Sequence, residues 1–477
     1  MTRQPPTLAK AGFAAGPVLV VVAAKCALEL AVAGRYGWHR DELYYAVAGL
    51  HLQGGYVDFP PLTALVAALA RTLFGWSLVG LRAFTILASA GTVLVGALVA
   101  RELGATRRAQ TLAAVMIGFT PGMLGSNLLF QPVAFDQLTT MIVLWLAVRL
   151  ALGRGSWPLL GVAAGIGLET KYTLAVVLVL LIAGFAAGRR DVLHSRGFPL
   201  AIVIAAVLLV PNLVWEAGHG WTSVHFVLDP PPSATQETRP QFIVDLILLT
   251  LVAFPVALAG VVMLVRDRAL RPLGWTIVGT VVAYFALDGK SYYALPVLVF
   301  ALAAGSIPFD RWATRRRLLA VGALFSVIGL LSLPLALPVL PLHTAVRDGI
   351  VKDRSDYQSE VGWPAFVALV KQHAAGIDVI VTANYGEAGA LEILGNGLPP
   401  VASTDVTLRY WRPRVQGRRA LVIGYTRGDV DFCHGYRVVA HVSSANDSDE
   451  GGEPVARCTL NGTLADIWPM IVATQDT

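Results

Sequence analysis

Long runs of apolar residues recur along the first 340 residues of the chain, separated by charged residues, glycine or proline. A helix that crosses the hydrocarbon core of a bilayer needs about 20 predominantly apolar residues. Inside that core the backbone can satisfy its hydrogen bonds only within helices or a closed barrel. Charged residues make up 14% of the 477 residues, whereas an average globular protein has about 25%. The sequence therefore predicts a polytopic α-helical membrane protein.

The apolar runs predict about eleven transmembrane helices. The first run, 11–34, is long enough to span and has no clean small-residue cleavage site, so we interpret it as an uncleaved first helix. The run 62–75 is short and carries Arg71, which favours an amphipathic helix on the membrane surface. The other spans are expected near 79–100, 109–129, 134–152, 157–172, 173–188, 198–216, 241–265, 273–287, 291–307 and 317–340.

Positive charges are distributed unevenly between the two sides. With a cytoplasmic N-terminus, the inner connections hold seventeen Lys and Arg residues and the outer ones hold five. The inner residues are Arg3, Lys10, Arg101, Arg107, Arg108, Arg149, Arg154, Arg189, Arg190, Arg196, Arg266, Arg268, Arg271, Arg311, Arg315, Arg316 and Arg317; the outer ones are Arg35, Arg40, Lys171, Arg239 and Lys290. Short cytoplasmic loops are enriched in Lys and Arg. We therefore expect a cytoplasmic N-terminus and, with an odd number of spans, an outer C-terminus. This location explains the net charge of +6 without a nucleic-acid partner.

The chain changes character after residue 340, which suggests a transmembrane domain at 1–340 and a second domain at 341–477. The pattern of the second part predicts helices at 363–375 and 386–394 and strands at 377–381, 420–423 and 437–442. We expect a small extracytoplasmic α/β domain. On that side of the membrane Cys433 and Cys458 can pair, and a disulfide over a loop of about 24 residues adds roughly 3 kcal/mol of stability.

Three acids, Asp41, Glu42 and Asp58, lie in the first outer loop and its surface helices, 35–78. Acids so close to a membrane are costly to place and usually mark function. Asp41 and Glu42 can also form an ordinary helix N-cap with an acidic first turn. Asp58 can equally be a turn residue before proline. The two interpretations of Asp41 are compatible, because a cap can hold a catalytic acid in place.

Further polar residues are expected at the outer face. They are Lys171, Tyr172, Glu216, His219, His225, Asp288, Lys290, Tyr292 and Tyr293, and Arg82 lies at the start of a span. A carboxylate can deprotonate a hydroxyl nucleophile, and Lys or Arg can stabilise a phosphate leaving group. The alternatives are that the lysines and Arg82 only extend toward the interface and that the tyrosines only reflect the preference of Tyr for that region.

Five motifs resemble one family of glycosyltransferases. DELYY…GGYVDFPPL at 41–62 resembles the first outer loop of polyprenyl-phosphate-sugar glycosyltransferases with a GT-C fold. The similarity is greatest to bacterial proteins of the dolichyl-phosphate-mannose–protein mannosyltransferase-like group, glycosyltransferase family 39, and to the related aminoarabinose transferases. GLETKYT at 167–173, PNLVWEAGHGWTSVHF at 211–226, DGKSYYALP at 288–296 and ANYGEAGALEILG at 383–395 are also similar to segments of this family.

The resemblance implies an inverting transfer, in which an acceptor hydroxyl attacks the anomeric carbon and a polyprenyl phosphate leaves. Asp41 matches the general base and Glu42 the second acid. Lys171 and Lys290 match basic positions that face the lipid phosphate; Asp58, Arg82, Tyr172, Tyr292 and Tyr293 are further candidates for donor binding. Aminoarabinose transferases commonly have Lys before the Pro-Pro, whereas this chain has Asp58-Phe59, which weakens the case for a lipid A acceptor.

The implied partners are a polyprenyl-phosphate-linked sugar, membrane lipids and an acceptor that is an envelope glycan, a lipid or a protein. The resemblance leaves the need for a metal open, because members of the family differ, and a divalent cation is the one candidate cofactor. Its candidate ligands are Glu216, His219 and His225, although their spacing matches no standard zinc motif. The expected location is the bacterial inner membrane. A transporter or flippase for a lipid-linked sugar and a non-catalytic scaffold for envelope assembly are the competing functions.

Overall fold

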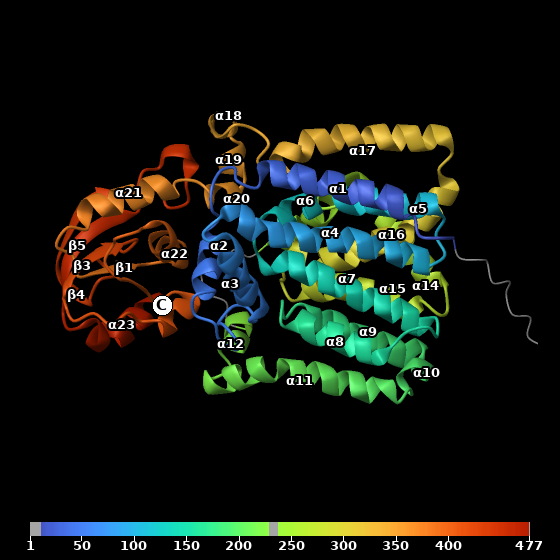
Figure 1. The fold of residues 1–477 in the computed structure, drawn as a ribbon, viewed down its shortest axis with the longest axis horizontal. Coiled ribbons are helices and arrows are strands. Elements are labelled where there is room, and N and C mark those ends of the chain that lie inside the picture. The colour runs from blue at the N-terminus through green and yellow to red at the C-terminus, as the bar shows by residue number, and fades with distance from the viewer. Residues whose placement is uncertain (1–10, 229–236, 477) are drawn as a thin grey trace, which may run out of the picture.

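The structure is a computed structural model that describes residues 11–228 and 237–476, so Arg3 and Lys10 lie outside the described residues. Apolar helices form a bundle, short helices cover one end of it, and an α/β domain lies beyond them (Figure 1). Within the described residues six helices are long and apolar enough to cross a membrane. They are α1 (Ala15–Val32), α4 (Leu78–Glu102), α7 (Pro132–Ala151), α11 (Gly197–Gly218), α16 (Leu295–Trp312) and α17 (Arg315–Ala336).

The remaining predicted spans are broken or short. One bent pair is α5 (Arg107–Phe119) and α6 (Pro121–Leu128), and another is α13 (Arg239–Leu248) with η1 (Leu251–Ala253) and α14 (Phe254–Arg266). The shorter helices are α8 (Trp157–Leu168), α9 (Leu174–Gly188) and α15 (Arg271–Ala286). Every predicted run contains a helix, so a multi-pass membrane protein is confirmed, whereas the count of eleven full spans is not.

Two of the predicted spans are bent. In 109–129, Pro121 has no amide N–H and favours an extended conformation of Thr120, so α5 and α6 meet at 55°. In 241–265, α13 and α14 meet at 90°, and Leu251 between them has a φ of 43°. Sequence hydropathy averages over such breaks because the residues on both sides remain apolar.

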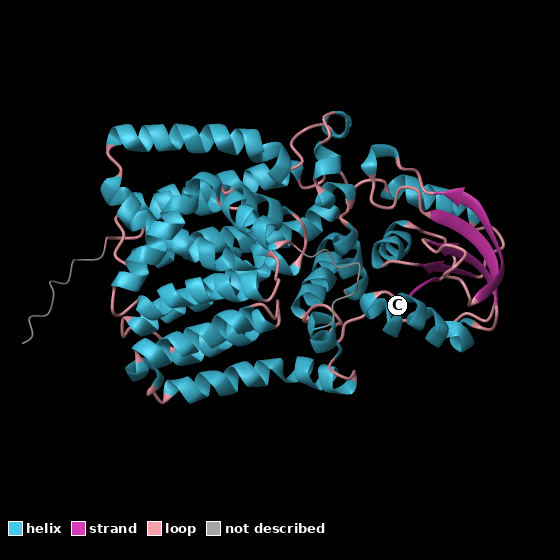
Figure 2. Ribbon diagram, turned by 180° about the vertical axis from the view of Figure 1, so that it is seen from behind, coloured by secondary structure: helices cyan, strands magenta, loops and turns pink. Residues whose placement is uncertain are grey.

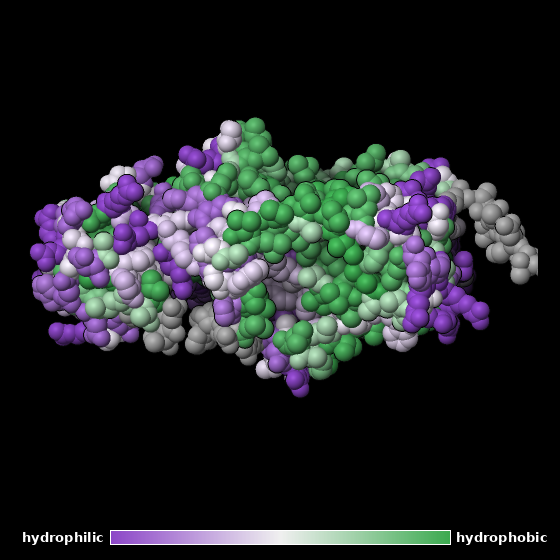
Figure 3. Space-filling model, turned by 90° about the horizontal axis from the view of Figure 1, so that it is seen from below, coloured by the Kyte–Doolittle hydropathy of each residue, from purple (hydrophilic) through white to green (hydrophobic). Residues whose placement is uncertain are grey.

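The end of the bundle far from the α/β domain is rich in arginine. At the end far from the α/β domain, Arg108 of α5 pairs with Asp310 of α16, and Arg154 pairs with Glu102 of α4. The predicted inner arginines that the structure describes flank the helices that meet there, next to α10 (Arg190–Leu193). Hydrophobic side chains cover the bundle between hydrophilic ends (Figure 3). This arrangement agrees with the loop assignment made from the positive charges.

Short helices form a layer between the bundle and the α/β domain (Figure 1). They are α2 (Arg40–Ala48), α3 (Leu62–Phe74), α12 (Thr222–Leu228), η2 (Ser291–Ala294), α18 (Leu342–Arg347), α19 (Ile350–Asp353) and α20 (Ser355–Gln358). The predicted helix at 62–75 is α3, and it exposes Leu65, Leu69 and Leu73, which lie four residues apart and therefore share one face. That apolar face is the one expected to lie on a membrane surface.

The α/β domain contains a five-stranded mixed sheet with the strand order β2-β1-β3-β5-β4 (Figure 2). The strands are β1 (Val379–Thr382), β2 (Val401–Ser403), β3 (Arg419–Ile423), β4 (Cys433–His441) and β5 (Pro454–Leu460); β1 runs parallel to β2 and β3, and β5 runs antiparallel to β3 and β4. The other elements are α21 (Trp363–His373), α22 (Tyr385–Leu394), η3 (Val406–Tyr410), η4 (Ala445–Asp447) and α23 (Leu464–Asp476).

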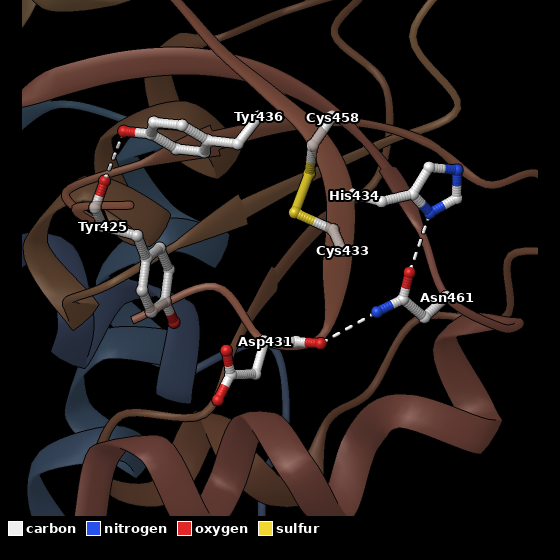
Figure 4. Close-up of a disulfide and its surroundings, with 7 residues drawn as sticks. All are labelled: Tyr425, Asp431, Cys433, His434, Tyr436, Cys458 and Asn461. Carbon is white, nitrogen blue, oxygen red and sulfur yellow. Dashed lines mark hydrogen bonds between the residues drawn. A yellow bond between two sulfur atoms is a disulfide. The ribbon is translucent and has the colours of Figure 1, made fainter. Parts of the chain in front are cut away.

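Alternate residues of the central strands bury against different helices. Ile380 and Leu421 pack with α21 and α22, whereas Val381 and Val422 pack with α23. The domain thus has three layers. Cys433 of β4 and Cys458 of β5 form a disulfide across neighbouring strands (Figure 4). The sequence patterns did not indicate β2, β5 or α23.

The layer and the α/β domain share one hydrophobic core, because α2 packs directly on α22. Their contact depends on two glycines of α22. A Cβ added at Gly389 would come within 2.8 Å of the Leu43 Cβ, and one added at Gly386 would come within 2.9 Å of the Arg40 Cβ. This close approach fixes the start of α2 against the start of α22.

Candidate active site

The first turn of α2 places two neighbouring acids in different surroundings. The Nδ1 atom of His39 accepts a hydrogen bond from the Asp41 amide at 3.1 Å, and the Glu42 carboxylate accepts one from the His39 amide at 2.8 Å. This capping box satisfies amides that a helix N-terminus leaves unpaired. Of the alternative interpretation, the acidic first turn is present, but the N-cap is His39 and not Asp41. The Asp41 side chain is therefore available for other contacts.

Glu42 belongs to a fully buried ion cluster. Its two carboxylate oxygens each lie 2.8 Å from a guanidinium nitrogen of Arg82, and the Phe130 amide also donates to it at 2.8 Å. Arg82 additionally donates to Glu360 at 3.2 Å and to two backbone carbonyls, and none of the three charged side chains is more than 1% exposed. The cluster joins α2, the start of α4 and the segment after α20.

Asp41 stands at the junction of the membrane-embedded part and the α/β domain. Its Oδ1 atom accepts a hydrogen bond from the Tyr385 hydroxyl at 2.7 Å, and its Oδ2 atom accepts one from the Gln131 amide group at 2.9 Å. The side chain is 26% exposed. Two donors from separate elements fix the carboxylate while its remaining lone pairs stay available to a ligand.

Asp41 lines a cavity of about 570 Å³ at the end of the bundle. Polar lining residues include His39, Gln131, Lys290, Tyr292, Arg354 and Asp356, and apolar ones include Leu129, Val133, Leu248, Leu249 and Leu335. Pro121 and Leu251, at the two helix breaks, also line it. Irregular backbone at membrane depth is tolerated where it is enclosed by protein or lines a cavity, so the breaks are explained by this site.

Two cationic side chains share the cavity with Asp41. Lys290 precedes η2, and Arg354 lies between α19 and α20, where its guanidinium donates to the Asp356 carboxylate at 2.6 Å. Burial alone would raise the pKa of Asp356, but the charges of Arg354 and His39 hold it below its usual range. Asp356 therefore stays ionised and offsets part of the positive charge.

Lys171 and the two tyrosines of η2 form a layer behind the cavity. The Lys171 ammonium lies 4.4 Å from the ring centre of Tyr293 and 4.8 Å from that of Tyr292, and Tyr292 itself lines the cavity. Lys171 lies in the turn between α8 and α9. Burial lowers its pKa to about 8, with Lys290 adding to the shift and Asp136 opposing it. Lys171 therefore does not line the cavity itself, but its ammonium contacts the ring of Tyr292, which does.

Asp58 lies near Asp41 but outside the cavity lining. The Tyr44 hydroxyl donates to it at 2.6 Å and lies 2.9 Å from the Thr407 hydroxyl. Burial, together with the charges of Asp41 and Asp405, raises the pKa of Asp58 to about 7. The structure thus gathers the carboxylates of Asp41, Asp58 and Asp405 near one another.

The remaining candidates lie in a separate polar cluster. The Tyr172 hydroxyl and Asn212 exchange a hydrogen bond, Ser223 donates to Glu216, and the His219 ring stacks on Trp215 at 4.2 Å. His225 is exposed. Among residues 11–228 and 237–476, no group of three or more His, Cys, Asp and Glu is placed to hold a metal ion. Glu216, His219 and His225 are therefore not brought together as ligands, because Glu216 and His219 already contact protein groups.

Sequence reasoning missed several residues of the site. Gln131, Arg354, Asp356 and Tyr385 contact or surround Asp41, but they come from elements far along the chain. A usable signal was present for Arg354, because the charged run 352–356 lies in the segment that follows the last predicted span, 317–340. Conversely, Glu42, Arg82, Lys171 and Tyr293 do not line the cavity.

The chain is similar to known proteins in sequence and in fold. A family described as dolichyl-phosphate-mannose-protein mannosyltransferase matches residues 58–215. An undecaprenyl phosphate-alpha-4-amino-4-deoxy-L-arabinose arabinosyl transferase of Pseudomonas paraeruginosa is 29% identical over 194 residues, which are 36% of this chain and 35% of that protein. Its counterpart in Pseudomonas savastanoi pv. phaseolicola is 32% identical over 165 residues, covering 33% and 31%. The chain thus spans about a third of the length of the curated relatives it matches.

Solved structures extend the likeness over the whole molecule. ArnT from Cupriavidus metallidurans in the apo state superposes with a TM-score of 0.66 at 16% identity, covering 94% of this chain and 98% of that one. The same protein bound to undecaprenyl phosphate gives 0.64 at 15%, covering 92% and 97%. The chain has the fold of ArnT. The GT-C fold predicted from the sequence is therefore confirmed, including the C-terminal α/β domain.

Proposed function

We propose that this protein transfers a sugar from a polyprenyl-phosphate-linked donor to an acceptor hydroxyl at the outer face of the membrane. The observation that carries the proposal is one cavity that combines the Asp41 carboxylate with the cations Lys290 and Arg354. A base and phosphate-stabilising cations are the two parts that this reaction needs. The ArnT fold, seen with undecaprenyl phosphate bound to that relative, supports the choice of donor.

In this mechanism Asp41 accepts the proton of the acceptor hydroxyl while the oxygen attacks the anomeric carbon and the bond to phosphate breaks, which inverts that carbon. Tyr385 and Gln131 keep the carboxylate oriented. Lys290 and Arg354 stabilise the negative charge that develops on the leaving phosphate. Lys171 acts as a positioning residue through Tyr292. Glu42 and Arg82 hold the start of α2, and Asp58 adds to the negative charge next to Asp41 at pH values above its pKa of about 7.

The apolar half of the cavity suits the prenyl chain. Leu248 ends α13, Leu249 follows it at the break before η1, and Leu335 comes from the end of α17. Apart from Ala336, α17 has no buried residue, so it stands on the outside of the bundle (Figure 1). A donor lying between α17 and the bundle keeps its tail among apolar side chains and its phosphate near Lys290.

The proposed location is the inner membrane of a bacterium, with the N-terminus in the cytoplasm and the α/β domain, 341–477, outside. Its support is the arginine-rich end of the bundle, because cytoplasmic loops are enriched in Lys and Arg. The disulfide Cys433–Cys458 in the α/β domain fits an oxidising compartment. The domain 1–340 then contains the catalytic machinery, completed by Arg354 and Tyr385 of the following part.

Replacement of Asp41 by Asn tests the proposal. Removal of a general base reduces the rate by about 10²- to 10⁴-fold, so a deletion strain complemented with Asp41→Asn should lack the envelope product that wild type restores, as measured by mass spectrometry of glycans and lipids. Asp348→Asn, at an exposed surface pair, is the matched control and should behave like wild type. Normal product with Asp41→Asn would reject the proposed base and favour a flippase or scaffold role.

A further inference from the structure

A second cleft, of about 700 Å³, lies between the α/β domain and the loop after α2. Its lining includes His51 from that loop, Glu392 from the end of α22, and Tyr410 and Trp411 from the end of η3. None of these residues lines the cavity of Asp41. The cleft has the size of typical small-ligand sites, about 300–1,000 Å³.

Aromatic rings in the cleft are held in place by one another. The His51 ring stacks on Trp411 with centres 4.5 Å apart, and Tyr56 contacts the Trp411 ring edge-on at 6.1 Å. Tyr410 is 41% exposed, and its ring rests on His219 at 5.0 Å. Such rings present large apolar faces with polar tips, and their mutual contacts mean that little side-chain freedom is lost when a ligand binds.

Polar groups of three kinds surround the rings. Glu392 supplies a carboxylate, Asn396 an amide and Arg412 a guanidinium. In the described part of the chain, Glu392 and Asn396 make no side-chain hydrogen bond, whereas Arg412 donates only to the Ala465 carbonyl at 3.4 Å. Donors and acceptors beside aromatic faces match a ligand that has apolar C–H faces ringed by hydroxyls, which is the chemistry of a carbohydrate.

An extended peptide fits the same cleft less well. The nearest sheet edge is β2, which is only three residues long, and Pro399 and Pro400 precede it. Proline has no amide N–H to donate to an added strand. Backbone pairing at this edge is therefore restricted, and the aromatic and polar side chains remain the main sources of binding.

The cleft and the Asp41 site are built on the same elements. α22 begins with Tyr385, which bonds Asp41, and carries Glu392 in the cleft. η3 carries Thr407, which contacts Tyr44, and leads into Trp411. The helix α2 connects Asp41 with the loop that holds His51, and its nine residues span about 13 Å at 1.5 Å per residue. An elongated acceptor can therefore contact both places.

We propose that this cleft is a subsite for the carbohydrate portion of the acceptor, about 13 Å or more from the reacting hydroxyl. The proposal rests on the proposed function and narrows its acceptor to a molecule that contains an oligosaccharide. The residues that bind it are Trp411, His51 and Tyr410 by ring contact and Glu392, Asn396 and Arg412 by hydrogen bonds.

A glycan array probed with the full-length protein in lipid nanodiscs tests the subsite directly. We expect wild type to bind a subset of oligosaccharides. Trp411→Leu should raise the Kd for the bound glycans by at least about tenfold, which corresponds to 1.4 kcal/mol. Glu392→Gln keeps the size of the side chain and should also weaken binding, which guards against loss of folding in the tryptophan variant. Trp312→Leu, at the arginine-rich end of the bundle, is the matched control and should bind like wild type.

The outcome separates this subsite from the catalytic proposal. Asp41→Asn should bind the same glycans as wild type, because Asp41 does not line the cleft. Absence of binding to every glycan by wild type, or unchanged binding by both Trp411→Leu and Glu392→Gln, would overturn the subsite even if Asp41→Asn abolishes sugar transfer. If the protein binds glycans and Asp41→Asn still transfers sugar, the catalytic assignment is overturned and the subsite is retained. Preference for Ser/Thr peptides of similar length over all glycans would also reject a carbohydrate subsite.

Discussion

The two ends of the helical bundle use charged residues in different ways. At the arginine-rich end, the ion pairs are partly exposed: Arg108 is 51% exposed beside Asp310, and Arg154 is 46% exposed beside Glu102. At the opposite end, Arg82, Glu42 and Glu360 are buried completely and join segments that are 40 and 278 residues apart.

The difference concerns what each set of charges stabilises. Partly exposed pairs contribute little to folding, so the arginines of the first end mainly determine orientation in the membrane. A buried pair is costly to desolvate, and removing one partner leaves an uncompensated charge. Such clusters are retained at the second end because they hold α2, and with it Asp41, in a fixed position.

The largest expected effect follows from breaking the buried cluster. Arg82→Met leaves Glu42 and Glu360 without their common partner, which costs about 3–5 kcal/mol. We expect a strong drop in thermal stability and loss of sugar transfer. Arg317→Met, an exposed arginine on Trp312 at the other end, is the control, and its unfolding temperature should stay close to that of wild type. Equal destabilisation by both substitutions would remove the distinction between the two ends.

A substitution of Lys290 tests whether a positive charge at the second end also contributes to catalysis. Lys290→Met removes a cation from the cavity of Asp41, and loss of one group that stabilises developing charge lowers kcat by about 10²- to 10³-fold. Turnover of a polyprenyl-phosphate sugar by purified protein measures the effect. Lys352→Met, at an exposed position on α19, should retain wild-type turnover. A Lys290 variant with normal kcat would place the leaving phosphate elsewhere.

Hydropathy and charge were sufficient to predict the helical bundle, its arginine-rich end and the mixed α/β character of the last part. They could not predict the breaks at Pro121 and Leu251, because apolar residues continue through both. Both breaks line the cavity. The departure from regular helix that matters most for the site therefore lies where the sequence pattern does not reveal it.

The candidate site was predictable to the extent that two motifs, at 41–62 and 288–296, contain its residues. Asp41, Lys290 and Tyr292 were singled out, and the structure places all three around one cavity. Arg354 and Tyr385 were missed because they reach Asp41 only through the return of the chain after α17 and the packing of α22 on α2. Such contacts between distant segments have no periodic signature in the sequence.

A smaller effect is expected from titrating Lys171. Because the pKa of folded Lys171 is about 8, its ammonium is charged below that pH and loses its proton as the pH rises through it. If the charge positions Tyr292 near the donor phosphate, the KM for donor should rise above pH 8, by about tenfold per 1.4 kcal/mol lost. Lys171→Arg retains its charge and should remove this rise, whereas Lys171→Met should have a raised KM at every pH. A pH-independent KM in wild type would exclude a role for this charge in donor binding.

The smallest effect is expected at the arginine-rich end. Glu102→Gln removes the acid that lies 3.6 Å from Arg154, and the partial exposure of that pair limits the loss of stability to about 1 kcal/mol or less. The Debye length falls from about 10 Å at 0.1 M salt to about 3 Å at 1 M, so the small difference from wild type should shrink at the higher salt concentration. Unfolding temperatures of the two proteins at low and high salt measure both effects. A large, salt-insensitive loss would mean that Glu102 is bound as tightly as Glu42, and charge at both ends would then stabilise the fold in the same way.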